Sequence, residues 1–354
     1  MKGLLVLENG KRFSGELIGE AEGVGELVFN TGMTGYQECF TDPSYEGQIL
    51  TLTYPLIGNY GIHEKAMQSV VPTGRGYVLD QVTSHPSNWE SEGTLTDFIL
   101  HYGVCCITRV DTRAVTKTVR TAGVMKAVIV QAGREEAYIS DLLHTALPIN
   151  QVERVTTKKP YTVGSGSHKV ALLDCGVKRS IVQALARNDC TVHVYPAHTP
   201  AEELLSCEPD GFFLSPGPGD PKDVPYVVDT VRRLMGKRPI FGICLGTQVL
   251  SLALGAHTFK LPFGHRGSNH PVKDLSTGKV YITSQNHGYA VSDEGLPDTI
   301  VVTHRSVNDG TIEGIRHRTL PIQAVQYHPE ATPGPQDNFY LFKEFTRAME
   351  EFRK

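Results

Sequence analysis

The sequence lacks the features that typically place a protein in a membrane or outside the cell. No apolar run approaches the ~18 residues that a membrane-spanning helix needs. The apolar stretch in residues 1–8 is too short for a signal peptide and is expected to form a strand. The seven cysteines are an odd number and include no Cys-X-X-Cys pair, so no disulfide framework is expected. These features predict a cytoplasmic protein with reduced cysteines.

The sequence also lacks a strong excess of charge and any familiar phosphate loop. A net charge of -4 over 354 residues argues against general binding to nucleic acids or anionic membranes. Neither a Walker motif nor a kinase-type glycine-rich loop is present. With 40% apolar and 20% charged residues the composition is that of an ordinary globular protein. At about 150 residues per domain, the length predicts two domains.

A polar, aperiodic segment separates two regions with different patterns. Residues 156–168 are rich in residues that break regular structure and predict a linker. In residues 169–354 strands and helices alternate, which predicts an α/β domain with a mainly parallel sheet flanked by helices. Residues 1–155 are richer in short strands and turns, which predicts a smaller, mixed, strand-rich domain. One helix is expected there between an N-cap at Asp111 and a C-cap at Gly123.

The pentapeptide Gly-Ile-Cys-Leu-Gly at residues 242–246 is the strongest candidate for a catalytic motif. It stands between a short apolar run and a helix-like segment, and a strand–turn–helix is the geometry that exposes a nucleophile. Gly242 and Gly246 lack a Cβ, so the backbone can turn sharply around Cys244. The thiol would then lie at a helix N-terminus, where the helix dipole favours a thiolate. The alternative is a buried cysteine that only packs in the core.

A second candidate motif, His-Pro-Glu, follows an expected strand over residues 322–327. His328 and Glu330 are two residues apart, so an extended backbone points both side chains the same way. A carboxylate beside an imidazole can set its tautomer and stabilise its charged form, as a Cys-His-acid triad requires. Alone the motif is typical of a surface turn, but together with Cys244 it favours catalysis.

A third segment, residues 211–221, ends an apolar strand in a loop with three prolines and two glycines. Such a loop can direct backbone N–H groups at one point, as an oxyanion hole does. Without the other two motifs, an ordinary turn would be the better interpretation.

Taken in order, Ser-Pro-Gly-Pro-Gly-Asp, Gly-Ile-Cys-Leu-Gly and His-Pro-Glu resemble a class I, triad-type glutamine amidotransferase domain. This resemblance covers the chain from about Lys169 onward. Four segments of the first half resemble the N-terminal domain of the small subunit of carbamoyl-phosphate synthase, namely residues 29–38, 41–45, 53–61 and 111–113.

The resemblance implies a catalytic triad of Cys244, His328 and Glu330. It also implies that glutamine is held, largely through backbone groups, by Ser44, Gly217, Gly219, Leu245, Gln248, Asn286, Gly288 and Tyr289. Phe is common in the family at the last of these positions, so the tyrosine is a mild departure that a backbone contact tolerates. From the residues alone, 284–290 is expected to be a polar turn after a strand over 280–283, and Ser44 to lie in a turn.

The implied function is hydrolysis of glutamine through a cysteinyl thioester, with the ammonia channelled to a large synthetase subunit in a heterodimer or higher assembly. That subunit would use ATP and bicarbonate to make carbamoyl phosphate for arginine synthesis, pyrimidine synthesis or both. This chain has no recognisable ATP-grasp-like region, so we expect no cofactor here and ATP with Mg on the partner.

Two other functions remain as alternatives. An amidotransferase for another synthetase, such as anthranilate synthase, would not carry the N-terminal domain, and a scaffolding protein would not need an intact triad. No metal is expected, because His265 and His270 stand five apart without a nearby carboxylate pair and are typical of a surface loop. The pair Cys105-Cys106 lies in an apolar run and is expected to pack in the core.

Overall fold

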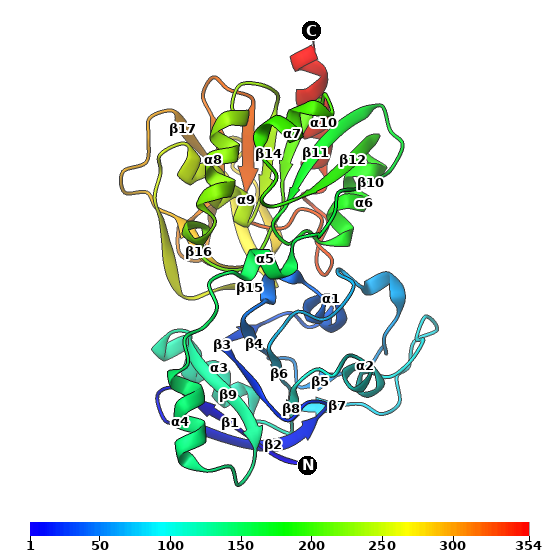
Figure 1. Ribbon diagram of the computed structural model, residues 1–354, viewed down its shortest axis with the longest axis vertical. Coiled ribbons are helices and arrows are strands. Elements are labelled where there is room, and N and C mark those ends of the chain that lie inside the picture. The colour runs from blue at the N-terminus through cyan, green and yellow to red at the C-terminus, as the bar shows by residue number, and fades with distance from the viewer. Residues whose placement is uncertain (354) are drawn as a thin grey trace. The chain divides into compact units, whose positions relative to one another are not determined.

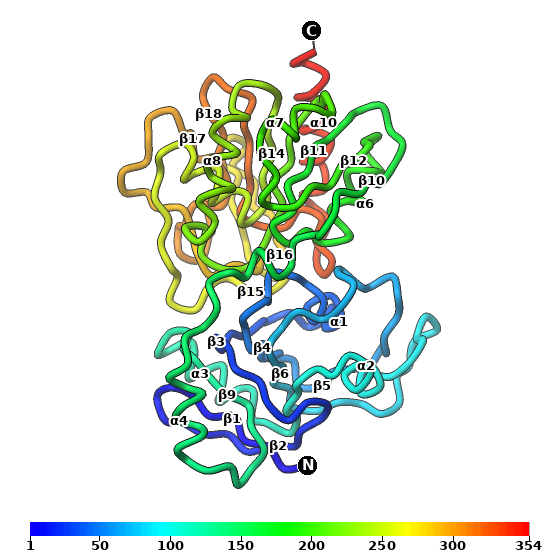
Figure 2. The backbone as a smooth tube through the Cα atoms, in the orientation of Figure 1, coloured from blue at the N-terminus to red at the C-terminus, as the bar shows by residue number. Residues whose placement is uncertain are grey.

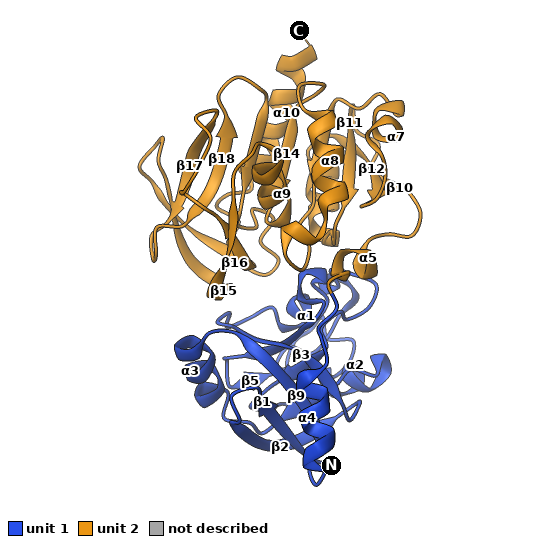
Figure 3. Cartoon of the chain, turned by 60° about the vertical axis from the view of Figure 1, so that its left-hand side comes forward, with its two compact units in different colours: residues 1–148 blue, residues 149–354 orange. Residues whose placement is uncertain are grey.

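The computed structural model describes residues 1–353. The chain forms two compact units, Met1–Pro148 and Ile149–Lys354, shown in different colours in Figure 3. Each unit has its own hydrophobic core and is described by itself. No helix in residues 1–353 is long and apolar enough to cross a membrane.

The first unit is built around a closed barrel of seven strands in the order β1-β2-β8-β6-β4-β3-β9. The pairs β3–β4, β4–β6 and β6–β8 are parallel and the others are antiparallel, so this unit is the mixed, strand-rich domain that the sequence predicts. The barrel strands are β1 (Lys2–Leu7), β2 (Arg12–Ile18), β3 (Gly23–Asn30), β4 (Gln48–Leu52), β6 (Gly76–Val78), β8 (Cys106–Thr108) and β9 (Met125–Gln131).

The remaining elements of this unit cover or connect the barrel. They are α1 (Tyr36–Phe40), η1 (Pro43–Tyr45), β5 (Leu56–Ile57), η2 (Glu64–Ala66), β7 (Gln81–Val82), α2 (Leu95–Tyr102), α3 (Thr112–Ala122) and α4 (Glu136–His144). The predicted caps of α3 are confirmed: the Asp111 carboxylate accepts from Ala114 N at 2.9 Å, and Gly123 ends the helix at a φ of 87°. Cys105 and Cys106 are buried, which confirms their prediction as core residues.

The second unit contains a ten-stranded sheet in the order β10-β12-β11-β13-β14-β19-β18-β16-β15-β17. Only the run from β12 to β19 is parallel, and β10 and the strands from β18 to β17 pair antiparallel. The strands are β10 (Tyr161–Val163), β11 (His168–Asp174), β12 (Cys190–Pro196), β13 (Gly211–Leu214), β14 (Ile240–Ile243), β15 (Thr258–Asp274), β16 (Val280–Val291), β17 (Ile300–Ser306), β18 (Ile312–His317) and β19 (Ile322–Val325).

The prediction of a mainly parallel sheet is therefore wrong for half of this sheet. From β15 to β19 the strands follow one another through short connections without a helix, as Figure 2 lets the reader follow. Parallel neighbours need a long crossover, so directly connected strands must pair antiparallel.

Helices cover both faces of the parallel half (Figure 1). One apolar layer includes side chains of α7 (Ala201–Ser206), α8 (Pro225–Leu234) and α9 (Leu245–Ala253), and the other those of α6 (Arg179–Arg187) and α10 (Tyr340–Arg353). Strand residues alternate between the two layers, so that Phe212 and Leu214 belong to the first and Phe213 to the second. The shorter helices are α5 (Gln151–Val155) and η3 (Pro221–Asp223).

Residues 156–168, for which the sequence predicts a linker, carry regular structure. Strand β10 lies inside this segment and pairs with β12 at the edge of the sheet. At its start, the Thr156 hydroxyl donates to the Asp174 carbonyl at 2.5 Å. The backbone pairing that β10 makes with β12 depends on distant residues, which the local composition does not reveal.

Candidate active site

Cys244 stands at a sharp turn between β14 and α9. Its φ of 54° and ψ of -109° are unusual for a residue with a side chain, and such strain is kept where the surrounding structure enforces it. The flanking glycines are part of that enforcement: a Cβ on Gly246 would lie 2.5 Å from the Leu214 carbonyl oxygen, and one on Gly242 would lie 2.8 Å from Leu250 Cδ1. The predicted strand–turn–helix around this cysteine is confirmed.

Cys244 contacts two segments that are distant in sequence. The residue is only 2% exposed, and its Sγ lies 3.6 Å from the backbone oxygen of Asn286 on β16. Its backbone N–H donates to Val325 at the end of β19, at 2.9 Å. Because β19 leads directly to His328, the same contacts bring the predicted nucleophile and the predicted base together.

His328 and Glu330 are both buried and form a direct hydrogen bond. His328 Nδ1 and Glu330 Oε1 are 2.7 Å apart, and the His328 backbone N–H donates to the Ser284 carbonyl at 2.9 Å. With Nδ1 on the carboxylate, the ring's other nitrogen is left for the thiol. That nitrogen, Nε2, has no hydrogen bond within residues 1–353, and catalytic hydrogen bonds often shorten only when substrate binds.

The environment of His328 favours its protonated form. Burial by itself would lower the pKa, but the charge of Glu330, the neighbouring Cys244 side chain and the hydrogen bond to Glu330 raise the pKa of His328 to about 10. This shift favours the imidazolium that forms when the ring accepts the thiol proton.

Lys178 completes this network, although no motif pointed to it. Its Nζ donates to Glu330 Oε1 and to the Ala331 carbonyl, both at 2.9 Å, and its side chain is 3% exposed. Burial would raise the pKa of Glu330, but the Lys178 charge and then that of His328 lower it to about 2. Lys178 follows β11 at the carboxyl edge of the parallel strands, where ligand and catalytic groups gather in such sheets, and this position was the one signal available.

The loop after β13 approaches the turn that carries the nucleophile. A Cβ on Gly217 would lie 2.3 Å from the Cys175 carbonyl oxygen and 2.8 Å from Leu245 Cδ2, so only glycine fits between them. Gly219 has a φ of 89°, which also favours glycine. Gly217 therefore lies beside Leu245 at the elbow, where backbone N–H groups of an oxyanion site would be needed.

The predicted glutamine contacts on residues 284–290 belong to a strand. The expectation of a polar turn is wrong, because β16 continues through Val291 by pairing with β15. Gln248 reaches this strand from α9: its Nε2 donates to the Tyr289 carbonyl at 2.8 Å and to Gln326 Oε1 at 3.1 Å. Asn286 and Gly288 lie on the same strand, one residue to either side of the buried His287.

Ser44 belongs to the first unit and lies in η1. Its backbone N–H donates to the Asp42 carboxylate at 2.9 Å, which forms the expected turn. Its hydroxyl is buried and has no hydrogen-bond partner within residues 1–353. The predicted contact of Ser44 with glutamine remains a prediction.

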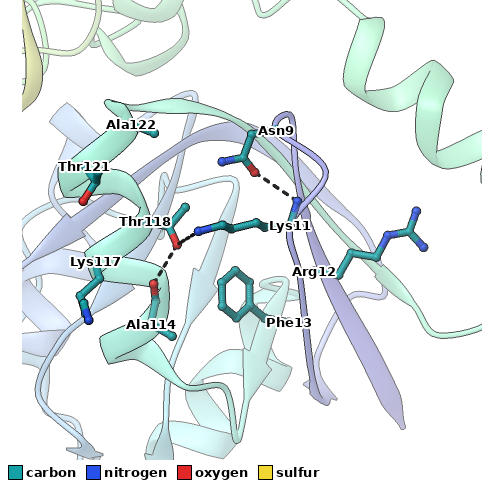
Figure 4. Close-up of a pocket in the computed structure, with 9 residues that line it drawn as sticks. All are labelled: Asn9, Lys11, Arg12, Phe13, Ala114, Lys117, Thr118, Thr121 and Ala122. Atoms are coloured by element: carbon teal, nitrogen blue, oxygen red, sulfur yellow. Dashed lines mark hydrogen bonds between the residues drawn. The ribbon is translucent and has the colours of Figure 1, made fainter.

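A surface hollow of about 480 Å³ in the first unit offers a different kind of site (Figure 4). It lies between the β1–β2 turn and α3, and Lys11, Arg12 and Lys117 are among its lining residues. Lys11 Nζ is engaged by the Thr118 hydroxyl at 3.2 Å, and Arg12 is paired with Glu136. The residues that line the hollow include no cysteine, histidine or carboxylate, so it offers no acid or base to activate a nucleophile.

The chain is similar to two protein families that together cover most of it. Residues 171–348 match the glutamine amidotransferase class-I family, and residues 5–129 match the carbamoyl-phosphate synthase small chain, CPSase domain. The carbamoyl phosphate synthase small chain of Lactococcus lactis subsp. lactis (strain IL1403) is 49% identical over 355 residues, covering 100% of this chain and 99% of the relative. That of Streptococcus pneumoniae serotype 4 is 48% identical over the same shares of both chains.

A solved structure also matches part of the chain. It is that of a putative GMP synthase protein from Thermoplasma acidophilum, with 23% identity and a TM-score of 0.47. The match covers 52% of this chain and 96% of that one.

Proposed function

This chain belongs to the carbamoyl-phosphate synthase small-chain family, which hydrolyses glutamine to supply ammonia for carbamoyl phosphate synthesis, and we propose that Cys244, His328 and Glu330 perform that hydrolysis. The observation that carries the proposal is the convergence of the three side chains. They come from two separate turns at the ends of adjacent parallel strands, β14 and β19. A nucleophile, a proton carrier and an orienting acid are the groups that amide hydrolysis needs.

In the proposed reaction, Cys244 Sγ attacks the side-chain amide carbon of glutamine and His328 accepts the thiol proton. The ring then gives this proton to the departing amide nitrogen, so that ammonia leaves and a γ-glutamyl thioester remains. In the second half, His328 takes a proton from water as the water attacks the thioester, and returns that proton to the departing sulfur, so that glutamate and the free thiol are released. Glu330 keeps Nδ1 protonated and stabilises the imidazolium in both halves, and Lys178 keeps Glu330 ionised.

Backbone groups supply the rest of the proposed glutamine site. N–H groups of the elbow and of the loop after β13 would stabilise the tetrahedral oxyanion. Gln248 and the backbone of β16 would hold the amino-acid end, with Ser44 of the first unit as a further contact. The residues with these roles are Gly217, Gly219, Leu245, Gln248, Asn286, Gly288, Tyr289 and Ser44. Their support is the close fit of Gly217 to Leu245 and the hydrogen bond of Gln248 to Tyr289.

Replacement of the nucleophile tests the triad. In a complex with the large subunit, Cys244→Ser should abolish glutamine-dependent synthesis and leave synthesis from added ammonia intact. Mass spectrometry of the wild type should find a γ-glutamyl adduct on Cys244. Cys207 is a more exposed cysteine of the same unit, and the matched control Cys207→Ser should behave like the wild type. Near-normal glutaminase activity in Cys244→Ser would overturn the assignment.

We further propose that the ammonia passes directly to a large synthetase subunit that binds ATP and Mg, and that this chain needs no cofactor of its own for the hydrolysis. Direct transfer has a chemical reason, because free ammonia at neutral pH is mostly ammonium, which is not a nucleophile. Two segments of the first unit, residues 30–38 and 55–61, are the proposed docking surface. Met33 and Leu56 within them are 70% and 40% exposed, and exposed apolar side chains are a common feature of interfaces.

Coupling to the partner is tested by kinetics. The chain alone should hydrolyse glutamine slowly, and addition of the large subunit with ATP and bicarbonate should accelerate the hydrolysis. Met33→Ser should weaken this acceleration without changing the slow basal rate. Val280, the first residue of β16, is also apolar and exposed, and the control variant Val280→Ser should leave the acceleration unchanged. An unchanged turnover on adding the partner would refute the coupling, whatever the status of the triad.

A further inference from the structure

A second group of buried ionisable side chains lies in the antiparallel half of the sheet. His265 on β15, His287 on β16 and Glu313 on β18 are all buried, and their ligand atoms lie within 4.8 Å of one another. The expectation that His265 belongs to a surface loop is therefore wrong, because β15 continues through this residue and β16 pairs with it. None of these three side chains has a part in the proposed hydrolysis.

Both ring nitrogens of His287 face oxygen atoms. Nδ1 lies 2.8 Å from the Tyr289 carbonyl oxygen, and Nε2 lies 2.9 Å from Gln285 Oε1. A neutral imidazole has one N–H and one lone pair, so one of these two contacts would set a lone pair against a lone pair. Because the Tyr289 oxygen can only accept, the proton belongs on Nδ1 and the lone pair of Nε2 points at Gln285.

The orientation of the Gln285 amide is determined by its other neighbours. The Thr283 hydroxyl donates to the His270 carbonyl at 2.8 Å, so its oxygen is left to accept from Gln285 Nε2 at 3.1 Å. The amide oxygen must then face the histidines. Turning the amide over would satisfy His287 but would break the bond to Thr283.

Both ring nitrogens of His265 also face oxygen atoms, two of which belong to carboxylates. Its Nε2 lies 2.8 Å from Asp309 Oδ2, and its Nδ1 lies 3.0 Å from Gln285 Oε1 and 3.2 Å from Glu313 Oε1. The other carboxylate oxygen of Glu313, Oε2, is buried without a hydrogen-bond partner within residues 1–353. The cluster thus directs lone pairs of two rings, an amide and a carboxylate toward one region.

Protons alone satisfy this arrangement poorly. If only His265 carried two protons, the lone pair of His287 Nε2 would still face the Gln285 oxygen. If both rings carried two protons, two imidazolium rings would be buried with their centroids 4.9 Å apart. Like charges at this distance in a buried site disfavour each other. A single divalent cation accepts the same lone pairs and balances the two carboxylates, Glu313 and Asp309, while both rings stay neutral.

We propose that this cluster is a binding site for a divalent transition metal of the zinc class, held by His265 Nδ1, His287 Nε2 and Glu313, with Gln285 Oε1 as the fourth ligand. Two imidazole nitrogens favour such a metal over Mg²⁺ or Ca²⁺, which prefer oxygen ligands alone. The outer contacts of a metal-bound histidine are already in place. His265 donates its other N–H to the Asp309 carboxylate and His287 to the Tyr289 carbonyl, and such partners fix ring orientation in metal sites.

The metal would have a structural role beside the glutamine site. Its ligands come from β15, β16 and β18, so it would join three strands of the sheet. Strand β16 also supplies Asn286, whose backbone oxygen contacts the Cys244 thiol, and Tyr289, whose carbonyl accepts from Gln248. The inference does not depend on the triad assignment, because it would stand even if Cys244 were not the nucleophile.

Metal content is the direct test, on full-length protein made with a histidine-free purification tag. After incubation with ZnCl₂ and gel filtration, elemental analysis should find about one tightly held zinc per chain, as for a closed site of this ligand set. Glu313→Gln and His265→Gln should each lose it. His193→Gln, a half-buried histidine of β12 outside the cluster, should keep it. EDTA should lower the melting temperature of the wild type and of His193→Gln but not of Glu313→Gln.

A spectroscopic measurement on the wild type keeps the test decisive if the variants do not fold. Co²⁺ added to the EDTA-treated protein should give the intense visible bands of a four- or five-coordinate nitrogen and oxygen site, and Zn²⁺ should abolish them. The proposal is overturned if the wild type retains neither ion after gel filtration. It is equally overturned if Glu313→Gln and His265→Gln fold and bind as much zinc as the wild type does.

Discussion

The second unit contains two buried networks of imidazoles and carboxylates that solve the same electrostatic problem differently. In the first, His328 is hydrogen-bonded to Glu330, and the Lys178 ammonium neutralises that carboxylate. In the second, the rings of His265 and His287 face Glu313, and Asp309 lies on the far side of His265. A buried carboxylate needs a compensating cation in either case, since an unpaired buried charge is costly.

The difference lies in where the cation comes from. Lys178 is part of the chain, so the first network is complete without a ligand and His328 is free to exchange one proton with the thiol. The second network leaves ring nitrogens and carboxylate oxygens directed at one another, and a bound metal would complete it. A resident cation thus suits a site where a proton must move, and a set of converging lone pairs suits a site that binds an ion.

Substitution within the triad should have the largest effect and tests whether His328 is the residue that transfers the proton. His328→Asn should reduce the kcat for glutamine hydrolysis by about a thousandfold, because no other group can move the proton. Glu330→Gln should cost about ten- to a hundredfold less than His328→Asn does, because the ring remains and only its orientation and charge stabilisation are lost. Steady-state kinetics of both variants in the complex measures the two losses. Equal losses would show that the hierarchy is assigned wrongly.

Removal of the resident cation should be the next largest effect. Lys178→Met leaves the Glu330 charge buried without its ammonium, and breaking a buried pair in this way costs about 3–5 kcal/mol of stability. Urea denaturation followed by fluorescence or circular dichroism measures that loss. The double variant Lys178→Met/Glu330→Gln should recover much of the stability, because no charge is then stranded, although its kcat should be no higher than that of Glu330→Gln. Lys169→Met, at an exposed lysine of β11, is the control and should unfold like the wild type.

If the double variant were no more stable than Lys178→Met, the lysine would contribute mainly by packing. The two networks would then differ less than their charges suggest, because the charge of Lys178 would not be what stabilises the first network.

The pH dependence of stability should show the same ion pair from another direction. The pKa of His328 is raised from 6.5 to about 10, so the stability that its charge contributes is fully present below pH 6.5 and is lost as the pH rises through 10. The pKa of Glu330 is lowered from 4.5 to about 2, so its contribution is fully present above 4.5 and is lost as the pH falls through 2. The wild type should therefore exceed Glu330→Gln in melting temperature most between pH 4.5 and 6.5.

Scanning calorimetry of both proteins below, within and above this pH range measures how the difference in melting temperature changes with pH. A difference in melting temperature that grew as the pH rose from 6.5 toward 10 would contradict the raised pKa of His328.

Local sequence patterns were enough for the parts of the site that depend on neighbours in the chain. Gly242 and Gly246 around Cys244 predict a sharp turn, and the spacing of His328 and Glu330 predicts that they share a direction. Both follow from backbone geometry over a few residues.

Residues whose role depends on distant strands could not be predicted in this way. Lys178 reaches Glu330 across 152 positions of sequence. His265 meets Glu313 across 48 positions, only because β15, β16 and β18 share a sheet. The antiparallel half was missed for a different reason, because the strand–helix alternation was expected to continue to the end of the chain. The alternation that predicts parallel pairing is present only between β11 and β14.

The smallest expected effect concerns the outer contact of the second network and would sharpen the comparison most. Asp309 touches His265 from the side away from Glu313, so in our proposal it orients a metal-binding ring without binding the metal itself. Loss of such a partner typically lowers metal affinity about ten- to a hundredfold. Asp309→Asn should therefore still bind zinc, but with an affinity reduced by a factor near the lower end of that range. Competition with a chromophoric chelator measures the affinity of both proteins.

The matched control is Asp298→Asn, at an exposed aspartate before β17, which should bind zinc like the wild type. The direction of the Asp309→Asn result separates the two views of this cluster. If His265 carries two protons and no metal binds, neutralising Asp309 removes a counter-charge, so the melting temperature falls equally with and without zinc. If a metal binds, the loss appears mainly as weaker stabilisation by zinc, while the EDTA-treated proteins differ little. The first outcome would make both networks proton-based and remove the distinction between them.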